Sequence, residues 1–138
     1  MITAKLHCSN FFNRILTSFN VLDSVDFRTG YITGLAEKVY LGACNGAMMK
    51  PKSTETELIF SLATKIAETY SLGIFKYSYQ ENTKDIEEIW ILRNEEAQKM
   101  LEALETLSVN SPGWHSIRGL LCGIPQAEID TEFHLTHN

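Results

Sequence analysis

The spacing of the hydrophobic residues changes near residue 72, and this change constrains the fold more than any other feature. Over 54–70 the apolar residues recur at the 3.6-residue period of an amphipathic helix. After Gly73, the aromatic residues of 75–79 alternate with polar ones, and a polar turn over 81–84 leads into a second apolar run. Alternation with a short polar turn is typical of a β-hairpin. The chain is therefore predicted to contain a hairpin over 74–93 and cannot be all-helical.

Helical patterns dominate the rest of the chain. The sequence predicts a strand over 2–8, helices over 9–20, 31–44, 54–70, 94–107, 112–122 and from Pro125, a short strand over 21–27 and a loop over 47–52. Strands and helices do not alternate strictly, so we expect an α+β fold. It would have a small antiparallel sheet that includes the hairpin, five to six helices and a helical C-terminus. No linker or repeat divides residues 1–138, which predicts a single domain.

Several helix boundaries carry recognisable signals. Thr54 and Glu57 have the spacing of a capping box. Asn94 is expected to cap the helix that follows the hairpin, and Ser111 precedes a proline in the same way. Gly123 is expected to end the helix over 112–122.

Charge narrows the classes of partner. The 138 residues carry a net charge of −5, which argues against broad binding to nucleic-acid phosphates. Residues 1–80 hold eight basic and six acidic side chains, whereas residues 81–138 hold four basic and eleven acidic ones. The acidic 81–105 region would suit a basic protein partner or a head-to-tail contact between two copies, and the alternative is an exposed acidic helix face.

The cysteines and the lack of long apolar runs indicate the cellular compartment. The three cysteines, Cys8, Cys44 and Cys122, are far apart and form no C-x-x-C pair, so neither a disulfide framework nor a zinc knuckle is predicted. No run of about 18 apolar residues is present, so we expect no membrane span. These features favour the cytoplasm of a cell or of an infected host.

One helix carries the most suggestive group of polar residues. Phosphate-binding glycine loops and the common hydrolase motifs are absent. His115, Arg118 and Cys122 share one helical face, which we expect to lie opposite the face of Trp114, Ile117 and Leu121. An imidazole beside a guanidinium is a sensible grip for a phosphate or carboxylate. The alternative is a solvated face on which Arg118 pairs with a glutamate such as Glu105 or Glu128.

A second arginine precedes a predicted helix. Arg28 stands before the helix expected near Tyr31, where free backbone N–H groups favour an anion. If Arg28 and Arg118 converge, an aromatic ring of Tyr77, Tyr79 or Trp90 would complete a small site for a nucleotide-like ligand. The alternatives are an ordinary surface arginine and aromatic rings that pack in the sheet.

Two other groups of residues are judged unsuited to chemistry. His134 and His137 have a spacing compatible with metal binding, but a fraying terminus lacks the fixed geometry that ligation needs, so no metal is predicted. Glu87 and Glu88 are adjacent, so they should point to opposite faces of their strand and cannot form a carboxylate pair.

The run from Asn110 to Pro125, and within it W-H-x-x-R-G, resembles the tails of phage-encoded counter-defence proteins of the sponge type. The resemblance covers under an eighth of the chain. It implies a compact α+β homo-oligomer that sequesters a nucleotide immune signal, such as a cyclic ADP-ribose variant or a cyclic oligonucleotide, without cleaving it. It also implies that His115 and Arg118 contact the ligand.

Three functions follow as hypotheses. The first is a non-enzymatic binder of a small phosphate-containing ligand, with Arg118, His115, Arg28, Trp90 and Tyr79 as its site and no cofactor. The second is an inhibitor or adaptor that meets a basic protein through the acidic 81–105 region. The third is a phosphodiesterase in which His115 acts as general acid or base and Arg118 steadies the phosphate.

Overall fold

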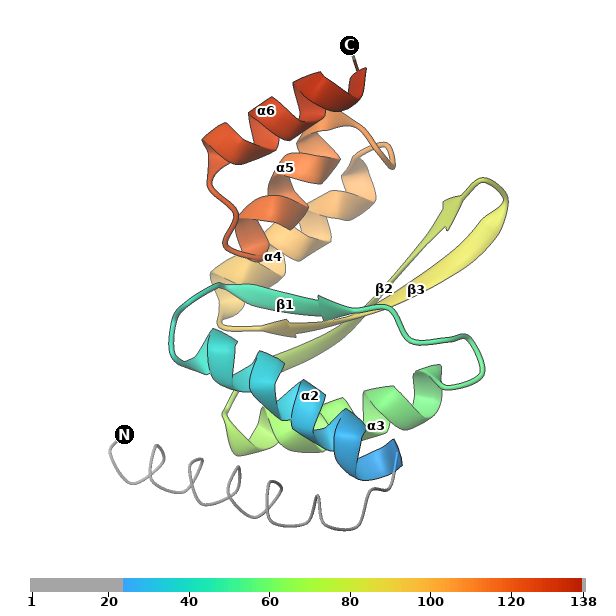
Figure 1. The fold of residues 1–138 in the computed structure, drawn as a ribbon, viewed down its shortest axis with the longest axis vertical. Helices are drawn as coiled ribbons and strands as arrows, with labels where there is room; N and C mark the ends of the chain where they lie inside the picture. The colour runs from blue at the N-terminus through green and yellow to red at the C-terminus, as the bar shows by residue number, and fades with distance from the viewer. Residues whose placement is uncertain (1–23, 138) are drawn as a thin grey trace.

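The computed structural model describes the backbone of residues 24–137 and the side chains of residues 27–131. The predicted strand over 2–8 and helix over 9–20 lie outside these residues. The elements follow the order α2 (Ser24–Tyr40), β1 (Gly46–Met49), α3 (Thr56–Thr69), β2 (Gly73–Glu81), β3 (Lys84–Leu92), α4 (Glu95–Ala103), a 3₁₀ turn (Leu104–Thr106), α5 (Pro112–Leu121) and α6 (Gln126–His137). Helices lie on both sides of one antiparallel sheet, which confirms the predicted α+β class (Figure 1).

The sheet has the strand order β1-β3-β2, so β3 is its central strand. β3 pairs antiparallel with both neighbours, and the β2–β3 pair is the predicted hairpin. Asn82 and Thr83 form its turn with φ of 51° and 67°. Positive φ at both central residues is typical of the tight turns that match the twist of two paired strands.

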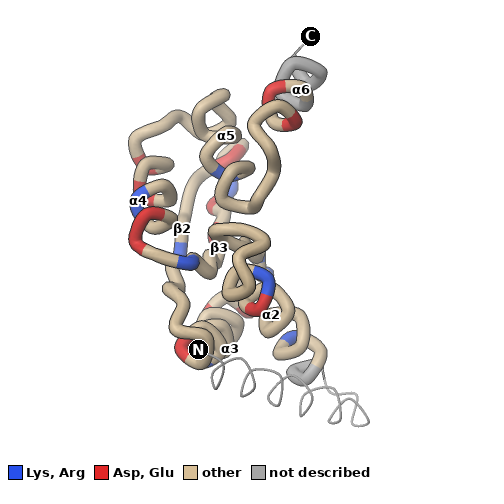
Figure 2. The backbone as a smooth tube through the Cα atoms, turned by 90° about the vertical axis from the view of Figure 1, so that its left-hand side faces the viewer, with Lys and Arg blue, Asp and Glu red and all other residues tan. Residues whose placement is uncertain are grey.

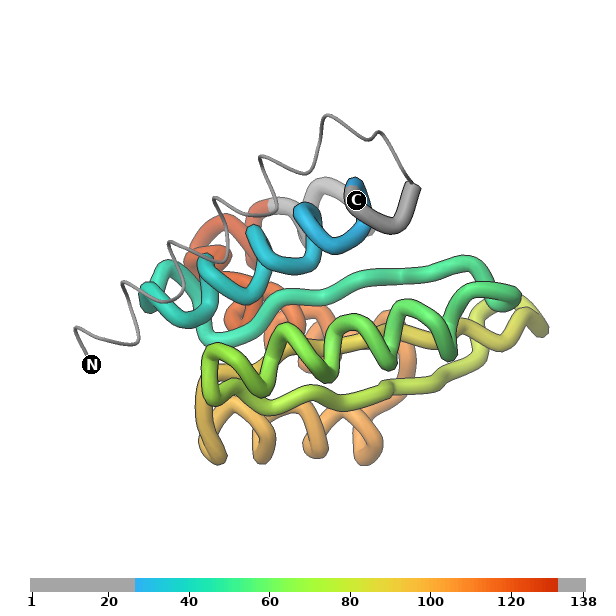
Figure 3. Tube along the Cα trace, turned by 90° about the horizontal axis from the view of Figure 1, so that it is seen from below, coloured from blue at the N-terminus to red at the C-terminus, as the bar shows by residue number. Residues whose placement is uncertain are grey.

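Each face of the sheet supports its own core, because side chains alternate along a strand. The lower face in Figure 1 carries Ile89 and Ile91 of β3 and is covered by α2 and α3, which lie side by side (Figure 3). The upper face carries Trp90 and Leu92 and is covered by α4 and α5, with α6 packed on α5. The predicted division of β2 is confirmed, since Tyr77 and Tyr79 are buried and Lys76, Ser78 and Gln80 are exposed.

The strand predicted over 21–27 is wrong, and so are the bounds of the helix predicted over 31–44. Within the predicted strand over 21–27, residues 24–27 belong to α2, which starts earlier and ends earlier than the helix expected over 31–44. A long helix places Ile32, Ala36 and Val39 together in the lower core. The burial of these three side chains stabilises the helix more than the alternation at 25 and 27 would stabilise a strand.

The predicted loop over 47–52 begins with a strand. β1 lacks polar alternation because Ala47 and Met49 enter the lower core while Met48 packs against the upper one. Its partner, β3, is about 40 residues away in the sequence, so no local pattern indicates the pairing. Residues 50–52 do form a loop.

The helix boundaries follow most of the predicted signals. The side chains of Asn94 and Ser111 accept hydrogen bonds from the backbone N–H groups of Ala97 and Trp114, at 2.9 and 3.3 Å. Gly123 ends α5 with a φ of 83°. The capping box at Thr54 is wrong, because α3 begins after Glu55 without a side-chain cap and Glu57 pairs with Lys76 instead.

Candidate functional site

A fully buried carboxylate, that of Glu88, lies at the centre of the upper face. Glu88 is 0% exposed although its neighbour Glu87 is exposed, so the two glutamates point to opposite faces as predicted. In the β2–β3 pair Glu88 stands opposite Tyr77. Extending the β1–β3 register by one residue places Lys50 on its other side. A buried carboxylate is costly unless it is paired and hydrogen-bonded, so its partners define the cluster.

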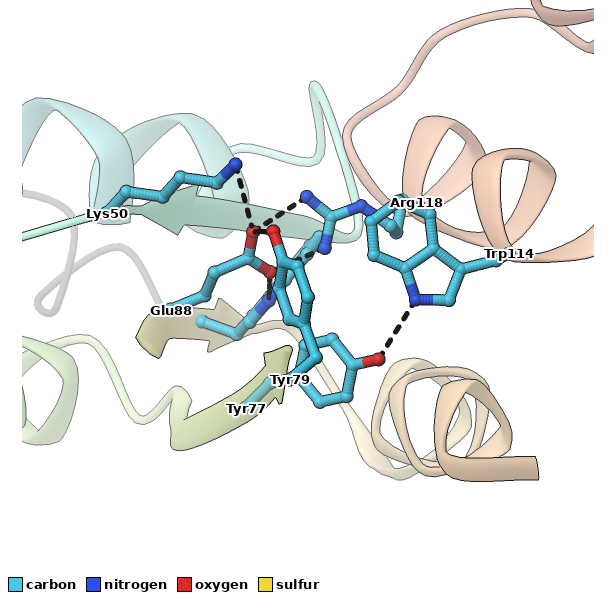
Figure 4. A network of polar contacts seen from close by, with 7 residues as sticks. Lys50, Tyr77, Tyr79, Glu88, Trp114 and Arg118 are labelled. Carbon is cyan, nitrogen blue, oxygen red and sulfur yellow. Dashed lines mark hydrogen bonds and ion pairs between the residues drawn. The ribbon is translucent and has the colours of Figure 1, made fainter. Parts of the chain in front are cut away.

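Arg118 of α5 is the main partner of Glu88 (Figure 4). Its Nη1 and Nη2 donate to Oε1 and Oε2 of Glu88 at 2.5 and 2.7 Å, a bidentate arrangement. Trp90 Nε1 donates to Oε1 at 3.1 Å, and the hydroxyl of Tyr79 donates to Oε2 at 3.0 Å. Lys50 Nζ lies 3.7 Å from Oε2 and is half exposed. Both carboxylate oxygens are therefore fully satisfied.

Aromatic rings enclose the guanidinium. The Cζ atom of Arg118 lies 4.1 Å from the ring centre of Trp114 and 5.7 Å from the ring centres of Tyr79 and Trp90. Trp114 in turn donates from Nε1 to the hydroxyl of Tyr77 at 2.9 Å (Figure 4). Cation–π contacts and this second hydrogen bond fix the position of the arginine.

The titration of the cluster follows from this packing. Burial disfavours the charged form of Arg118, but its hydrogen bonds to Glu88 and the charge of Glu88 outweigh that effect and raise the pKa of Arg118 above its usual value. Burial is also the main cause that raises the pKa of Tyr79, while the nearby Lys50 opposes the rise. Glu88 and Arg118 neutralise each other, so Lys50 is the surplus positive charge beside the cluster.

The predicted helix face of Arg118 is wrong. Arg118 shares the inward face of α5 with Trp114 and Leu121, at spacings of four and three residues, because its charge is matched by Glu88 inside the fold. Its partner is therefore neither Glu105 nor Glu128. His115 lies beside this face with its ring centre 5.1 Å from that of Trp114, in an edge-to-face arrangement.

A second feature, which we call the α2–β1 pocket, lies between the start of α2 and the end of β1. It encloses about 280 Å³ and is lined by Phe27, Arg28, Tyr31, Ile32, Met48, Met49, Lys50, Pro51, Glu55 and Ile59. Arg28 Nη2 donates to Oε1 of Glu55 at 2.5 Å. Phe27 and Tyr31, one helical turn apart, are 67% and 56% exposed. The pocket thus combines two cations, one carboxylate and two accessible aromatic rings.

The structure divides the five predicted site residues. Arg118, Tyr79 and Trp90 meet at Glu88, and His115 contacts the Trp114 ring beside them. Arg28 does not converge with Arg118: α2 packs under the lower face and α5 over the upper face, and each arginine pairs with a different glutamate. Lys50 belongs to both features, since it lines the pocket and approaches Glu88.

Sequence reasoning missed Glu88 and Lys50. A signal for Glu88 exists, because two consecutive carboxylates stand in the apolar strand over 84–92 and alternation forces one of them inward. Lys50 had no such signal, since its position depends on the pairing of β1 with β3.

Charged residues elsewhere are mostly distributed over helix surfaces. Exposed acidic side chains occupy α4 and the following turn, at Glu95, Glu96, Glu102 and Glu105, with Lys99 among them (Figure 2). Within the described part of the chain, no group of three His, Cys, Asp or Glu side chains is placed to hold a metal ion. The side chains of His134 and His137 fall outside that part. None of the helices described has the length and apolar character needed to cross a membrane.

Comparison with protein-family models, with curated proteins and with solved structures gave no significant match to this chain. The functional argument therefore depends on the geometry of the cluster and the pocket.

Proposed function

We propose that this protein is a non-enzymatic binder of a small phosphate-containing, nucleotide-like ligand, which it holds in the α2–β1 pocket. The observation that carries the proposal is the presence of Arg28 and Lys50 in one open pocket with two exposed aromatic rings. Cations neutralise a phosphate, and an aromatic ring offers a stacking surface for a base. Small-ligand sites combine apolar walls with a few polar groups in this way.

Both cations keep capacity for an anion. Glu55 occupies Nη2 of Arg28, but a guanidinium carries five N–H donors. Lys50 is not needed to neutralise Glu88, because Arg118 already does so with two hydrogen bonds. With Glu55 counted, the pocket carries one net positive charge, in a chain whose net charge is −5. An anion therefore finds a net positive charge at this pocket.

The proposal keeps the predicted contact at Arg28 and replaces that at Arg118 with Lys50. Nη1 and Nη2 of Arg118 both donate to the buried carboxylate of Glu88. A phosphate would have to break this buried ion pair, which is costly. We assign Arg118, Tyr79 and Trp90 the role of holding Glu88, against which Lys50 rests. The volume of about 280 Å³ favours a mononucleotide-sized ligand over a cyclic oligonucleotide. Sequestration of a nucleotide signal, as implied by the sponge resemblance, is the corresponding biological role.

The test is thermal unfolding of the protein with a panel of mononucleotides, ADP-ribose derivatives and cyclic di- and trinucleotides, followed by mass spectrometry of each ligand. A ligand at about 100 times its Kd stabilises the fold by roughly 2.7 kcal/mol. We expect a shift with mononucleotides or ADP-ribose derivatives, and recovery of the ligand intact. A shift accompanied by cleavage would replace the proposal with the phosphodiesterase hypothesis.

Matched variants locate the site. Lys50→Gln should weaken binding about 10-fold or more, since a hydrogen bond to a charged group contributes about 1.5–3 kcal/mol. Lys52→Gln removes the same charge from an exposed position outside the pocket and should leave the Kd unchanged. Equal effects of the two variants would contradict the assigned site. Silence across the panel would refute the proposal and favour a basic protein partner for the acidic residues of α4.

A further inference from the structure

Two cysteines that are 78 positions apart in the sequence meet in the fold, at a place independent of the pocket. Cys44 is buried in the connection between α2 and β1, and Cys122 follows α5 and is half-buried. A methyl group placed on Gly123 would stand 3.2 Å from Cβ of Cys44 and 3.1 Å from the carbonyl oxygen of Ala43. The backbone directly after Cys122 is therefore packed against Cys44.

The electrostatics of the thiols agree with this proximity. Burial is the main cause that raises the pKa of Cys122, and the neighbouring Cys44 raises it further. Arg118 and Lys38 are close enough to oppose the rise. The two thiols thus influence each other directly, and because the pKa of Cys122 is raised, its reactive thiolate should form mainly at alkaline pH.

The backbone spacing places the two cysteines near the distance that a disulfide needs. Gly123 is in van der Waals contact with Cys44, and the Cα atom of Cys122 is about 3.8 Å from that of Gly123. A disulfide needs Cα atoms about 4.4–6.8 Å apart. Gly42 and Gly123 lie in the turns that hold the two cysteines, with φ of 84° and 83°. Their N–H groups donate to the carbonyl oxygens of Val39 and Leu120, at 3.1 Å each, so these turns fix the approach of the two segments.

We propose that Cys44 and Cys122 form a redox-active dithiol that a small-molecule disulfide, such as oxidised glutathione, converts into an intramolecular disulfide. The more exposed Cys122 thiolate attacks one glutathione sulfur, which forms a mixed disulfide and releases one glutathione thiolate. Cys44, after losing its proton, attacks Sγ of Cys122 and releases the second glutathione thiolate. Two protein thiols are oxidised, one glutathione disulfide is reduced to two thiols, and the bond joins the α2–β1 connection to the end of α5.

The experiment uses the full chain with Cys8→Ser, so that only these two cysteines remain. After exposure to oxidised glutathione we expect a monomer about 2 Da lighter, with Cys44 linked to Cys122 in a non-reducing digest. The closed loop is long, so Tm should rise by roughly 10 °C, and dithiothreitol should reverse both changes. Loss of the mixed disulfide should also be at least about 10-fold faster in the folded protein than in urea, because the fold holds the thiols together.

Cys122→Ser in the same background is the control and should show neither the mass loss nor the Tm rise. Three outcomes would overturn the proposal: a stable glutathione adduct on Cys122, disulfides only between molecules, or two thiols that remain reduced. Equal cyclisation rates in the folded and urea-unfolded chains would also overturn it. None of these results depends on whether the pocket binds a ligand.

Discussion

Replacing Arg118 with methionine should reveal how much the fold depends on the Glu88 cluster. Methionine keeps most of the stem that packs on Trp114 but removes the charge and both hydrogen bonds to Glu88. Glu88 would remain fully buried, with Tyr79 and Trp90 as neutral donors and Lys50 at 3.7 Å. The variant therefore leaves a carboxylate in the core without its main counter-charge.

The expected loss of stability follows from that burial. Removing one partner of a buried ion pair costs about 3–5 kcal/mol. Lys50 remains nearby and half exposed, so the lower end of this range applies, about 3 kcal/mol. For a chain of 138 residues, each kcal/mol shifts Tm by roughly 3–5 °C, which gives a decrease of roughly 10–15 °C.

A double-mutant cycle separates the charge effect from lost packing. Glu88→Gln combined with Arg118→Met removes both charges and keeps an acceptor for the ring donors, so it should recover about half of the loss seen with Arg118→Met alone. Denaturant unfolding of the wild-type protein, both single variants and the double variant measures the coupling. Additive effects, or a decrease in Tm below about 3 °C for Arg118→Met, would refute the view that the pair is buried and coupled.

Three further predictions test other parts of the structure. The pKa of Tyr79 is raised from 10.0, so above about pH 10 the folded protein keeps a proton that the unfolded chain has lost. The free energy of unfolding should therefore fall as the pH rises above about 10. Tyr79→Phe should reduce this fall, as measured by denaturant unfolding between about pH 8 and 11. Thr83→Gly should raise the free energy of unfolding by about 1 kcal/mol, since a β-branched residue at φ 67° is strained, and an unchanged or lower value would argue against the hairpin turn. Asn94→Ala should lower the free energy of unfolding by about 1 kcal/mol through loss of the helix cap, whereas Asn94→Ser should retain most of it.

Much of the fold could be predicted because its signals are local. The hydrophobic period predicts the hairpin and α3, and the period together with the caps Asn94 and Ser111 predicts α4 and α5; both signals describe contacts within a few positions. β1 and the start of α2 were not recognised. β1 is a strand because β3 supplies its hydrogen bonds. α2 is long because the apolar side chains on its inward face are buried in the lower core. Local propensity is a weak guide where a distant partner determines the structure.

The candidate site, like the fold, has features that local sequence predicts and features that depend on distant contacts. Residue type alone indicated that Arg118 and Arg28 suit anions and that Tyr79 and Trp90 offer ring surfaces, and alternation alone separated Glu87 from Glu88. Only the tertiary structure decided that Arg118 points inward to Glu88, that Arg28 opens into a pocket with Lys50, and that Cys44 meets Cys122. The chemistry of a side chain is a property of its residue, whereas its partner depends on how distant segments pack, and a single sequence does not specify that packing locally.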